Sequence, residues 1–287
     1  MKKAVLSMDV EDWFHLDYFQ RNLCDETYSM LDGLEKYLRI LESNNLPSSF
    51  FVLGEIAEKR IDFFSELSRS GFDISSHGWN HVRPLSMSLD DFEEDLSKSK
   101  KIMKKINIDK EFGYRAPCFS LDRSRLDLLK KHSFSFSSSK IKFKNHPLYG
   151  SIDMEGYENV EDTIYRDEDF YEFELSTLEF FNKSLPICGG GYLRILPWKV
   201  MKKLITKYLH EEKDFYFYIH PFELSEKIPP TNLKAASRVN SFRFRYNIKS
   251  IEPKMREMFE LIDKAGYEFT DFYSLKTQIQ QSFKNED

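Results

Sequence analysis

Short apolar runs alternate along the chain with longer segments in which apolar residues recur every three or four positions. The short runs have the length of buried strands, whereas the longer segments have the spacing of amphipathic helices. Repeated units of a strand followed by a helix predict a parallel sheet that is covered by helices. We expect strands at residues 4–8, 49–53, 72–76, 112–118, 134–138, 215–220 and 268–271, and helices at 29–41, 55–70, 89–106, 123–132, 197–210, 251–265 and the C-terminus.

The predicted sheet could close into a barrel of about seven or eight mainly parallel strands, because α/β barrels of this chain length are ordinary. The chain contains neither an internal repeat nor a linker rich in glycine, serine or proline, so we expect a single domain over residues 1–287. Residues 141–185 differ from the rest, since they are acidic and aromatic and show weak periodicity. We interpret them as an acidic insertion. Their carboxylates could bind a metal, although such runs more often form a solvated surface.

Composition excludes some classes of protein. The net charge of -5 argues against nucleic-acid binding, which depends on lysine and arginine. No stretch approaches the roughly 20 apolar residues of a membrane helix, and the first apolar run stops at Asp9, too early for a signal peptide. The three cysteines are widely spaced and odd in number, which is typical of reduced thiols. We therefore expect a cytoplasmic protein without an integral membrane segment.

Reactive side chains gather where the predicted strands end, which is the functional face of such barrels. His77 and His81 follow the third strand, and Gly78 between them indicates a loop. Two histidines and one carboxylate would leave a position for water, as in catalytic zinc sites. Asp9 and Glu11 project to the same side of an extended strand, so one could bind the metal while the other accepts a proton. Asp12 competes with Glu11 as the ligand.

Each of these motifs has a simpler interpretation. The two histidines could be ordinary loop or core residues, and the acids could belong to a solvated turn. Arg115, at another strand end, could pair with a catalytic carboxylate or form a surface ion pair. His220 ends an aromatic strand, and its near-neutral titration suits proton donation, but a capping or core histidine would look the same. The placement of all these residues at strand ends favours the catalytic interpretation.

These strand ends, in this order, resemble the motifs of the polysaccharide deacetylases, also called the NodB-homology domain or carbohydrate esterase family 4. The resemblance extends from about residue 4 to about residue 275. It is strongest to a branch associated with exopolysaccharide and exosortase loci, which has an opening like SMDVEDWFH. That branch also carries the segments GYRAP, GGGY, HPFE and RFR, which stand here at residues 113–117, 189–192, 220–223 and 243–245.

The resemblance implies a distorted (β/α) barrel of the NodB-homology type and one divalent metal ion, usually zinc. The usual adjacent pair of aspartates is replaced here by DVED, which keeps Glu11 and Asp12 both open as ligands. The family's fourth motif, which orients the catalytic acid, has no counterpart among the serines at 137–139. The implied roles are general base for Asp9, metal ligands for Glu11, His77 and His81, positioning of the base for Arg115, and general acid for His220.

The implied activity is removal of an N-acetyl group from an amino sugar in polysaccharide or glycan-precursor biosynthesis. The sugar could be polymeric, lipid-linked or nucleotide-linked. Trp13, Trp79 and Tyr192 could stack on it, or they could be core aromatics. In an extended segment, Arg243 and Arg245 would project to one side and could hold an anionic carrier, although surface ion pairs with the acidic region would also explain them. The alternatives are a metal-independent, allantoinase-like hydrolase of cyclic amides or ureides, and a non-catalytic sugar-binding component of a polysaccharide assembly system.

Overall fold

The structure is a computed structural model that describes residues 1–108, 110–143, 146–180, 183–230 and 236–284. Its centre is a parallel sheet in the order β10-β1-β2-β3. The register is regular, with Met8 paired to Ile219 on one side and Asp9 paired to Phe51 on the other. The strands are β1 (Lys3–Val10), β2 (Ser49–Val52), β3 (Asp73–Ser76) and β10 (Phe215–Ile219), and β11 (Glu268–Thr270) pairs with the start of β1.

The sheet continues beyond β3 through a single residue. Tyr114 forms parallel bridges to Ser76 and to Ser137 of β4 (Phe136–Ser137), and β4 pairs in parallel with β7 (Phe170–Phe173). The strand predicted at 112–118 is therefore reduced to one bridging residue. It ends early because Pro117 begins a short 3₁₀ helix in which Cys118 has a φ of 52°.

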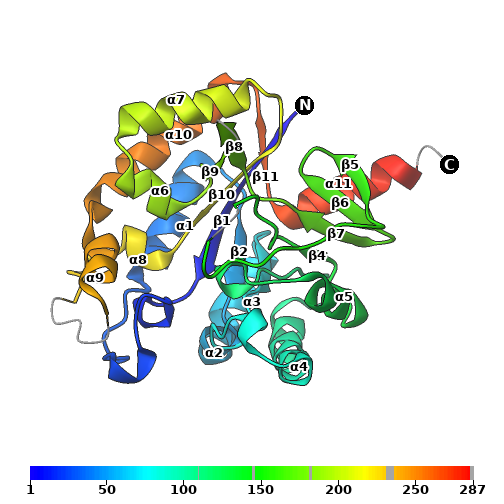
Figure 1. Cartoon of the computed structure of the whole chain (residues 1–287), viewed down its shortest axis with the longest axis horizontal. Coiled ribbons are helices and arrows are strands. Elements are labelled where there is room, and N and C mark those ends of the chain that lie inside the picture. Colours follow the sequence, from blue (N-terminus) through cyan, green and yellow to red (C-terminus); the bar gives the residue numbers. More distant parts are fainter. Residues whose placement is uncertain (109, 144–145, 181–182, 231–235, 285–287) are drawn as a thin grey trace.

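Among the named strands of the described residues, antiparallel pairs occur only in and next to residues 141–185, the segment predicted as an insertion. There β5 (Glu158–Glu161), β6 (Ile164–Asp167) and β7 form a meander, and β8 (Thr177–Phe180) and β9 (Lys183–Pro186) form a hairpin. Figure 1 shows the meander beside the C-terminal helix α11 (Phe272–Lys284). The hairpin returns the chain to the edge of β10, where Gly189 bridges Tyr218.

Aromatic side chains fill the space enclosed by the sheet. Phe51, Phe136, Phe173, Tyr216 and Phe272 come from four strands and α11, and neighbouring ring centroids lie 5.0–6.5 Å apart. Contact between rings of β7 and β10 shows that the two sides of the sheet curve toward each other. The fold is thus a distorted, mainly parallel barrel with a packed interior, which confirms the prediction.

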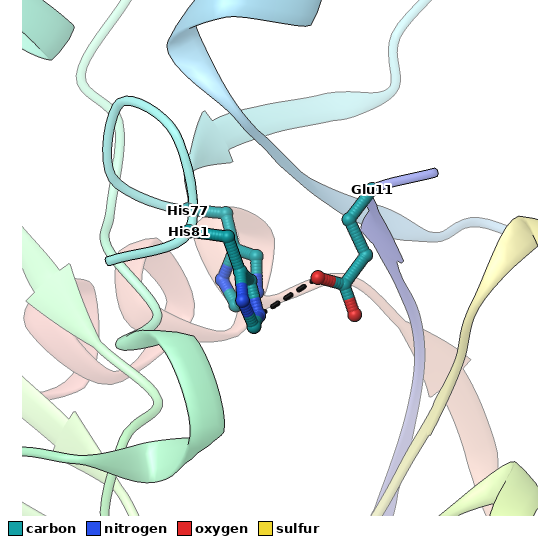
Figure 2. A group of neighbouring side chains, drawn as sticks. All are labelled: Glu11, His77 and His81. Carbon is teal, nitrogen blue, oxygen red and sulfur yellow. Dashed lines mark ion pairs between the residues drawn. The ribbon is translucent and has the colours of Figure 1, made fainter. Parts of the chain in front are cut away.

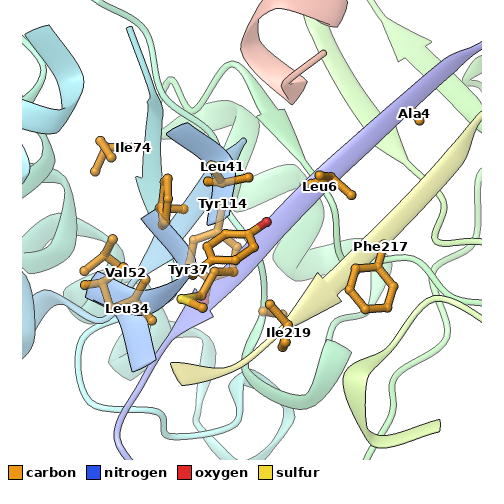
Figure 3. Close-up of a cluster of buried hydrophobic side chains, with 14 of the residues drawn as sticks. Ala4, Leu6, Leu34, Tyr37, Leu41, Val52, Ile74, Tyr114, Phe217 and Ile219 are labelled. Carbon is orange, nitrogen blue, oxygen red and sulfur yellow. The ribbon is translucent and has the colours of Figure 1, made fainter. Parts of the chain in front are cut away.

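Helices cover the outside of the barrel and bury the other face of each strand. In Figure 3, Leu34, Tyr37 and Leu41 of α1 lie beside Leu6 of β1 and Ile219 of β10, and all five side chains are buried. The helices other than α11 are α1 (Asp32–Asn44), α2 (Gly54–Lys59), α3 (Ile61–Arg69), α4 (Leu89–Ile106), α5 (Arg123–Lys131), α6 (Gly190–Ile195), α7 (Trp198–Leu209), α8 (Pro221–Leu224), α9 (Arg238–Arg245) and α10 (Ile251–Lys264).

Several helical segments differ from the prediction, and the short helices α6 and α8 were not predicted. The helix expected at 55–70 is broken at Arg60, whose φ of −132° interrupts the helical backbone between α2 and α3. Arg243 and Arg245, which an extended segment would place on one side, instead lie in α9, and the side chain of Ser237 caps this helix by accepting a hydrogen bond from the backbone of Asn240. Across the described ranges, none of the helices combines the length and the apolar character needed to cross a bilayer.

Candidate active site

Three potential metal ligands meet at the C-terminal end of the parallel sheet. Glu11 follows β1, whereas His77 and His81 follow β3, and one ligand atom from each lies within 4.8 Å of the others. All three residues are buried. Figure 2 shows the carboxylate and the two imidazoles turned toward one another. Two imidazoles and a carboxylate are the donor set of many catalytic zinc sites, so these residues fit a divalent cation.

Hydrogen bonding leaves ligand atoms free for such a cation. Nδ1 of His77 donates to the backbone oxygen of Arg115 at 2.8 Å, which leaves Nε2 with its lone pair. Oε2 of Glu11 is buried and makes no hydrogen bond, although it lies 2.7 Å from Nε2 of His81. A buried carboxylate oxygen is costly unless a cation is close to it, and here either the protonated ring of His81 or a metal ion could supply the charge.

The ionisation of these groups is compatible with metal binding. Burial lowers the pKa of His77 to about 4, so this imidazole is neutral at neutral pH. Burial alone would raise the pKa of Glu11, but the neighbouring His81, together with His220 and His77, lowers it to about 2. The carboxylate is therefore ionised wherever His77 is neutral. Burial alone would lower the pKa of His81, but Glu11 raises it, so His81 must give up its proton to bind a cation.

The segment that carries the two histidines is a loop, as expected. Gly78 has a φ of 77°, a conformation that favours glycine, and His81 has a φ of 65°. The backbone of Trp79 donates to the carboxylate of Asp95 at 3.2 Å, and burial raises the pKa of Asp95 to about 6. The loop is thus fastened to α4, and both imidazoles are aimed at Glu11.

Arg115 holds Asp9 at the end of β1. Its Nη1 donates to Oδ1 of Asp9 at 2.7 Å and to the hydroxyl of Ser7 at 2.9 Å. Its Nε and Nη2 donate to the backbone oxygen and the hydroxyl of Ser138 at 3.1 Å and 2.9 Å. The guanidinium also lies 4.0 Å from the centre of the Phe51 ring. A fully buried arginine with these contacts fixes the orientation of the carboxylate.

His220 ends β10 and faces the ligand cluster. Its Nε2 lies 3.4 Å from Oε1 of Glu11, and its Nδ1 lies 3.1 Å from Oε2 of Glu223. Burial would lower the pKa of His220, but the ion pair with Glu223 and the field of Glu11 raise it to about 9. The imidazole is therefore protonated at neutral pH.

Sequence reasoning missed the partners of His220. Oε1 of Glu223 accepts from Nε of Arg194 at 2.8 Å, and both side chains are buried, so the three residues form a continuous chain of charges. Two signals were present. The first is that Glu223 stands three residues after His220 in HPFE. The second is Gly190 of GGGY, because a Cβ at this position would lie 2.2 Å from the Glu223 carboxylate, so a glycine leaves the space that this side chain needs.

A cavity of about 340 Å³ opens over these side chains, and a second of about 300 Å³ adjoins it. Tyr192 lines the second cavity, and Arg243 lines both. The first is lined by Asp9, Glu11, His77, His81 and His220 together with side chains that carried no recognisable sequence pattern, namely Leu16, Asp17, Tyr18, Cys118, Phe119, His146, Pro147, Leu148, Tyr149, Tyr218 and Asn240.

Other candidate residues lie away from the cavity. Trp13 is buried against Phe19 and Phe244, and Trp79 packs against Lys98, 3.6 Å from its ring centre. Asp12 accepts hydrogen bonds from the backbone of Trp13 and Met30, so its carboxylate is directed away from the histidines. Because residues 238–245 are helical, Arg245 faces a different cleft from Arg243. We propose no substrate contact for Trp13, Trp79 or Arg245.

A second group of potential ligands shares His81. Asp17, His81 and Cys118 also bring one ligand atom each within 4.8 Å. The thiol of Cys118 donates to Oδ2 of Asp17 at 2.9 Å, and burial raises the pKa of the thiol well above its usual value. Because the thiol is protonated and already bonded, this group fits a metal less well than Glu11, His77 and His81 do.

Two family models match adjacent parts of this chain. Residues 25–137 match the family described as polysaccharide deacetylase, and residues 138–274 match a domain of unknown function, DUF3473. The peptidoglycan deacetylase of Helicobacter pylori is 26% identical over 117 residues, which are 41% of this chain. The match spans only 40% of the length of that relative.

Two solved structures show the same fold. A protein from Mycobacterium smegmatis, provisionally named a polysaccharide deacetylase, is 16% identical with a TM-score of 0.61, covering 98% of this chain and 91% of its own. Puue allantoinase is 9% identical with a TM-score of 0.59, covering 96% and 89%. Residues 25–137 therefore match the polysaccharide deacetylase family, and the chain as a whole shares the fold of these two structures.

Proposed function

We propose that this protein is a metal-dependent carbohydrate N-deacetylase that releases acetate from an N-acetylated amino sugar. The observation that carries the proposal is the shared cavity. Asp9 and His220 line the same space of about 340 Å³ as Glu11, His77 and His81, so a proton acceptor, a proton donor and a cation site face one substrate. By its resemblance to the exopolysaccharide branch, we place the reaction in polysaccharide or glycan-precursor biosynthesis.

The metal, for which zinc is the expected ion, would be held by Glu11, His77 and His81. When bound, it would polarise the amide carbonyl and make a water molecule acidic enough to attack near neutral pH. Asp9 accepts the proton of the attacking water in this mechanism. Arg115 keeps that carboxylate turned toward the cavity by holding Oδ1 at 2.7 Å, so its role is to position the base.

His220 donates a proton to the departing amine. An amine is a poor leaving group unless it is protonated, so amide cleavage depends on this step. The ion pair with Glu223 keeps His220 protonated and directs Nε2 toward the cavity, and Arg194 holds Glu223 in place. Glu223 and Arg194 are thus positioning residues, and they take the place of the family's missing fourth motif.

We also propose that residues 1–287 act as one catalytic domain, with 141–185 as an acidic insertion. The support is that β1, which precedes the segment matched as polysaccharide deacetylase, pairs over five residues with β10, which lies in the second matched segment. Tyr192 and Arg243 are the proposed contacts to the sugar or its carrier. Cys24, Cys118 and Cys188 are free thiols, which supports the proposed cytoplasmic location.

The direct test measures acetate released from N-acetylated oligosaccharides, lipid-linked sugars and nucleotide sugars, with and without a chelator. We expect release that the chelator abolishes and added zinc restores, and that is lost in Asp9→Asn with its metal retained. Hydrolysis of a cyclic ureide that is insensitive to the chelator would instead support the allantoinase-like alternative. Sugar binding without acetate release from any donor would support the non-catalytic one.

A further inference from the structure

Helix α9 presents an apolar strip to the outside of the molecule. Val239, Phe242 and Tyr246 are 59%, 60% and 40% exposed, and the spacing of three and four residues places them on one face. The rings of Phe242 and Tyr246 lie 4.9 Å apart, so the strip is continuous. Contiguous exposed apolar side chains on a soluble surface commonly mark an interaction site.

Arginines border this strip on both sides. At 100° per residue, Arg238 and Arg245 fall on one edge of the exposed face and Arg243 falls on the other. No ion pair joins any of the three to an acidic side chain within the described parts of the chain. Their charge is therefore available to an anionic partner.

The surroundings of the strip add further positive charge. Arg245 lines a cleft of about 740 Å³ together with Lys227 and Lys249. The acids of that cleft include Glu226 and Glu252, which lie 3.7 Å and 2.9 Å from Lys36 and are thus partly neutralised. Lys227 itself donates to a backbone oxygen.

The exposure of the strip is built into the fold. On the inner side of α9, Phe244 is fully buried against Phe19 and Phe222. Nη1 of Arg194 donates to the backbone oxygens of Arg243 and Tyr246 at 2.6 Å and 3.0 Å. These contacts fix the orientation of the helix, so the apolar strip is held outward. Figure 1 places α9 at the periphery of the molecule.

We propose that α9, with Tyr246, docks the protein on an anionic lipid bilayer. A short helix with an apolar face bordered by arginines can insert its apolar side chains at the level of the headgroups, while the guanidiniums pair with lipid phosphates. The charge on both borders favours an anionic bilayer over an apolar protein partner, because arginine near such a surface adds attraction. Docking itself does not depend on the proposed activity.

One consequence rests on the proposed function. Arg243 belongs to the docking helix and also lines the cavity that contains Asp9 and His220. A docked protein would hold that cavity beside the headgroups, where a lipid-linked sugar presents its anionic carrier. Among the three carriers considered, docking favours the lipid-linked one.

The test is sedimentation of the full-length protein with phosphatidylcholine vesicles, with and without phosphatidylglycerol. We expect binding that requires phosphatidylglycerol and weakens with salt. Val239→Ser/Phe242→Ser and, separately, Arg238→Gln/Arg245→Gln should each lower the bound-to-free ratio by about tenfold or more. The matched controls are Leu85→Ser/Leu89→Ser, whose side chains are 41% and 45% exposed, and Lys104→Gln/Lys105→Gln on α4.

The controls should bind like the wild type, and thermal melting should show that every variant is folded. Wild-type protein that stays in solution with phosphatidylglycerol vesicles would overturn the proposal, and so would α9 variants that bind as the controls do. Val239→Ser/Phe242→Ser should retain full acetate release from a water-soluble donor. Failure of vesicle binding with acetate release intact would therefore reject the docking site alone.

Discussion

Glu223 lies three residues after His220 and places Oε2 at 3.1 Å from the Nδ1 of that histidine, while Oε1 accepts a hydrogen bond from Arg194 at 2.8 Å. The same Oε2 accepts from the backbone nitrogen of His220 at 3.1 Å. The carboxylate therefore fixes both the ring and the main chain of His220. Because Glu223 is fully buried, its charge acts on the imidazole with little screening by solvent.

This relationship predicts the effect of Glu223→Gln. Removal of the negative charge lowers the pKa of His220, which the ion pair raises to about 9. An acid must be protonated to work, so the basic limb of the pH–rate profile should move to lower pH by about one unit or more. Glu226→Gln is the control, since Glu226 is exposed and pairs with Lys36. A basic limb that stays in place would mean that Glu223 is only a structural residue.

Substitutions of Asp9 and His220 should differ in which substrates are hydrolysed more slowly. Asp9→Asn should abolish attack on amides and esters alike, because both begin with activation of water. His220→Ala should slow amide cleavage by about 10²–10⁴-fold but affect an aryl acetate less, since a phenolate departs without a proton. Metal content of both variants should be measured first. Equal losses of His220→Ala on amide and ester would exclude it as the acid of the leaving group.

The metal site can be tested separately from activity. The wild type should bind about one zinc ion per chain, and His77→Ala should lose it, because His77 belongs to only one of the two ligand groups. Cys118→Ser should keep the ion, since Cys118 belongs only to the other. Elemental analysis after dialysis reports both. Loss of metal in Cys118→Ser with retention in His77→Ala would move the site to Asp17, His81 and Cys118.

Arg115 should be a major contributor to stability. Its side chain is fully buried, and Arg115→Gln would leave Asp9 buried without its cation. Removing one partner of such a pair typically costs about 3–5 kcal/mol in the free energy of unfolding. Arg256→Gln, which breaks an exposed pair with Glu252, should cost less than about 1 kcal/mol. Urea unfolding measures both, and a loss of similar size in the two variants would contradict the argument.

The sequence predicted a helix or strand correctly where the spacing of its apolar residues reflected which side chains are buried in the fold. The predicted bounds of α4 match the structure, because its apolar residues recur at helical spacing and Ser88 caps its first turn. Helix α9 also has a serine cap, at Ser237, but the alternating phenylalanines and arginines at 242–245 suggested an extended segment. Since Phe244 is the one buried side chain in α9, that alternation did not reflect burial on one face of a strand.

In the candidate site, the sequence predicted the residues at strand ends but not the contacts that depend on how the helices pack. Asp9, Glu11, His77, Arg115 and His220 could be grouped in advance, because parallel strands bring their C-terminal ends to one edge. The pairing of Glu223 with Arg194 could not, since it depends on how closely α6 approaches α8. The sequence could not predict that Trp13 is buried either, because an aromatic side chain near a strand end suits a core as well as a sugar-binding surface.

A buried acid outside the site predicts how stability depends on pH. Oε1 of Glu172 accepts from the backbone nitrogens of Ser139 and Lys140, each at 2.7 Å, while Oε2 has no hydrogen bond. Burial raises the pKa of Glu172 from 4.5 to about 7 despite these donors. Folding thus favours the protonated form, and its contribution to stability, complete below about pH 4.5, is lost as pH rises through 7.

Glu172→Gln should remove this dependence, because glutamine stays neutral and can still accept both backbone hydrogen bonds. The free energy of unfolding of the variant relative to the wild type should rise by up to about 3 kcal/mol between pH 5 and pH 8. Comparing the two proteins at both pH values cancels other titrating groups and any fixed cost of the amide. Glu158→Gln, at an exposed position, should show almost no such change. A difference between wild type and Glu172→Gln that is constant with pH would mean that Glu172 is ionised in the folded protein throughout this range.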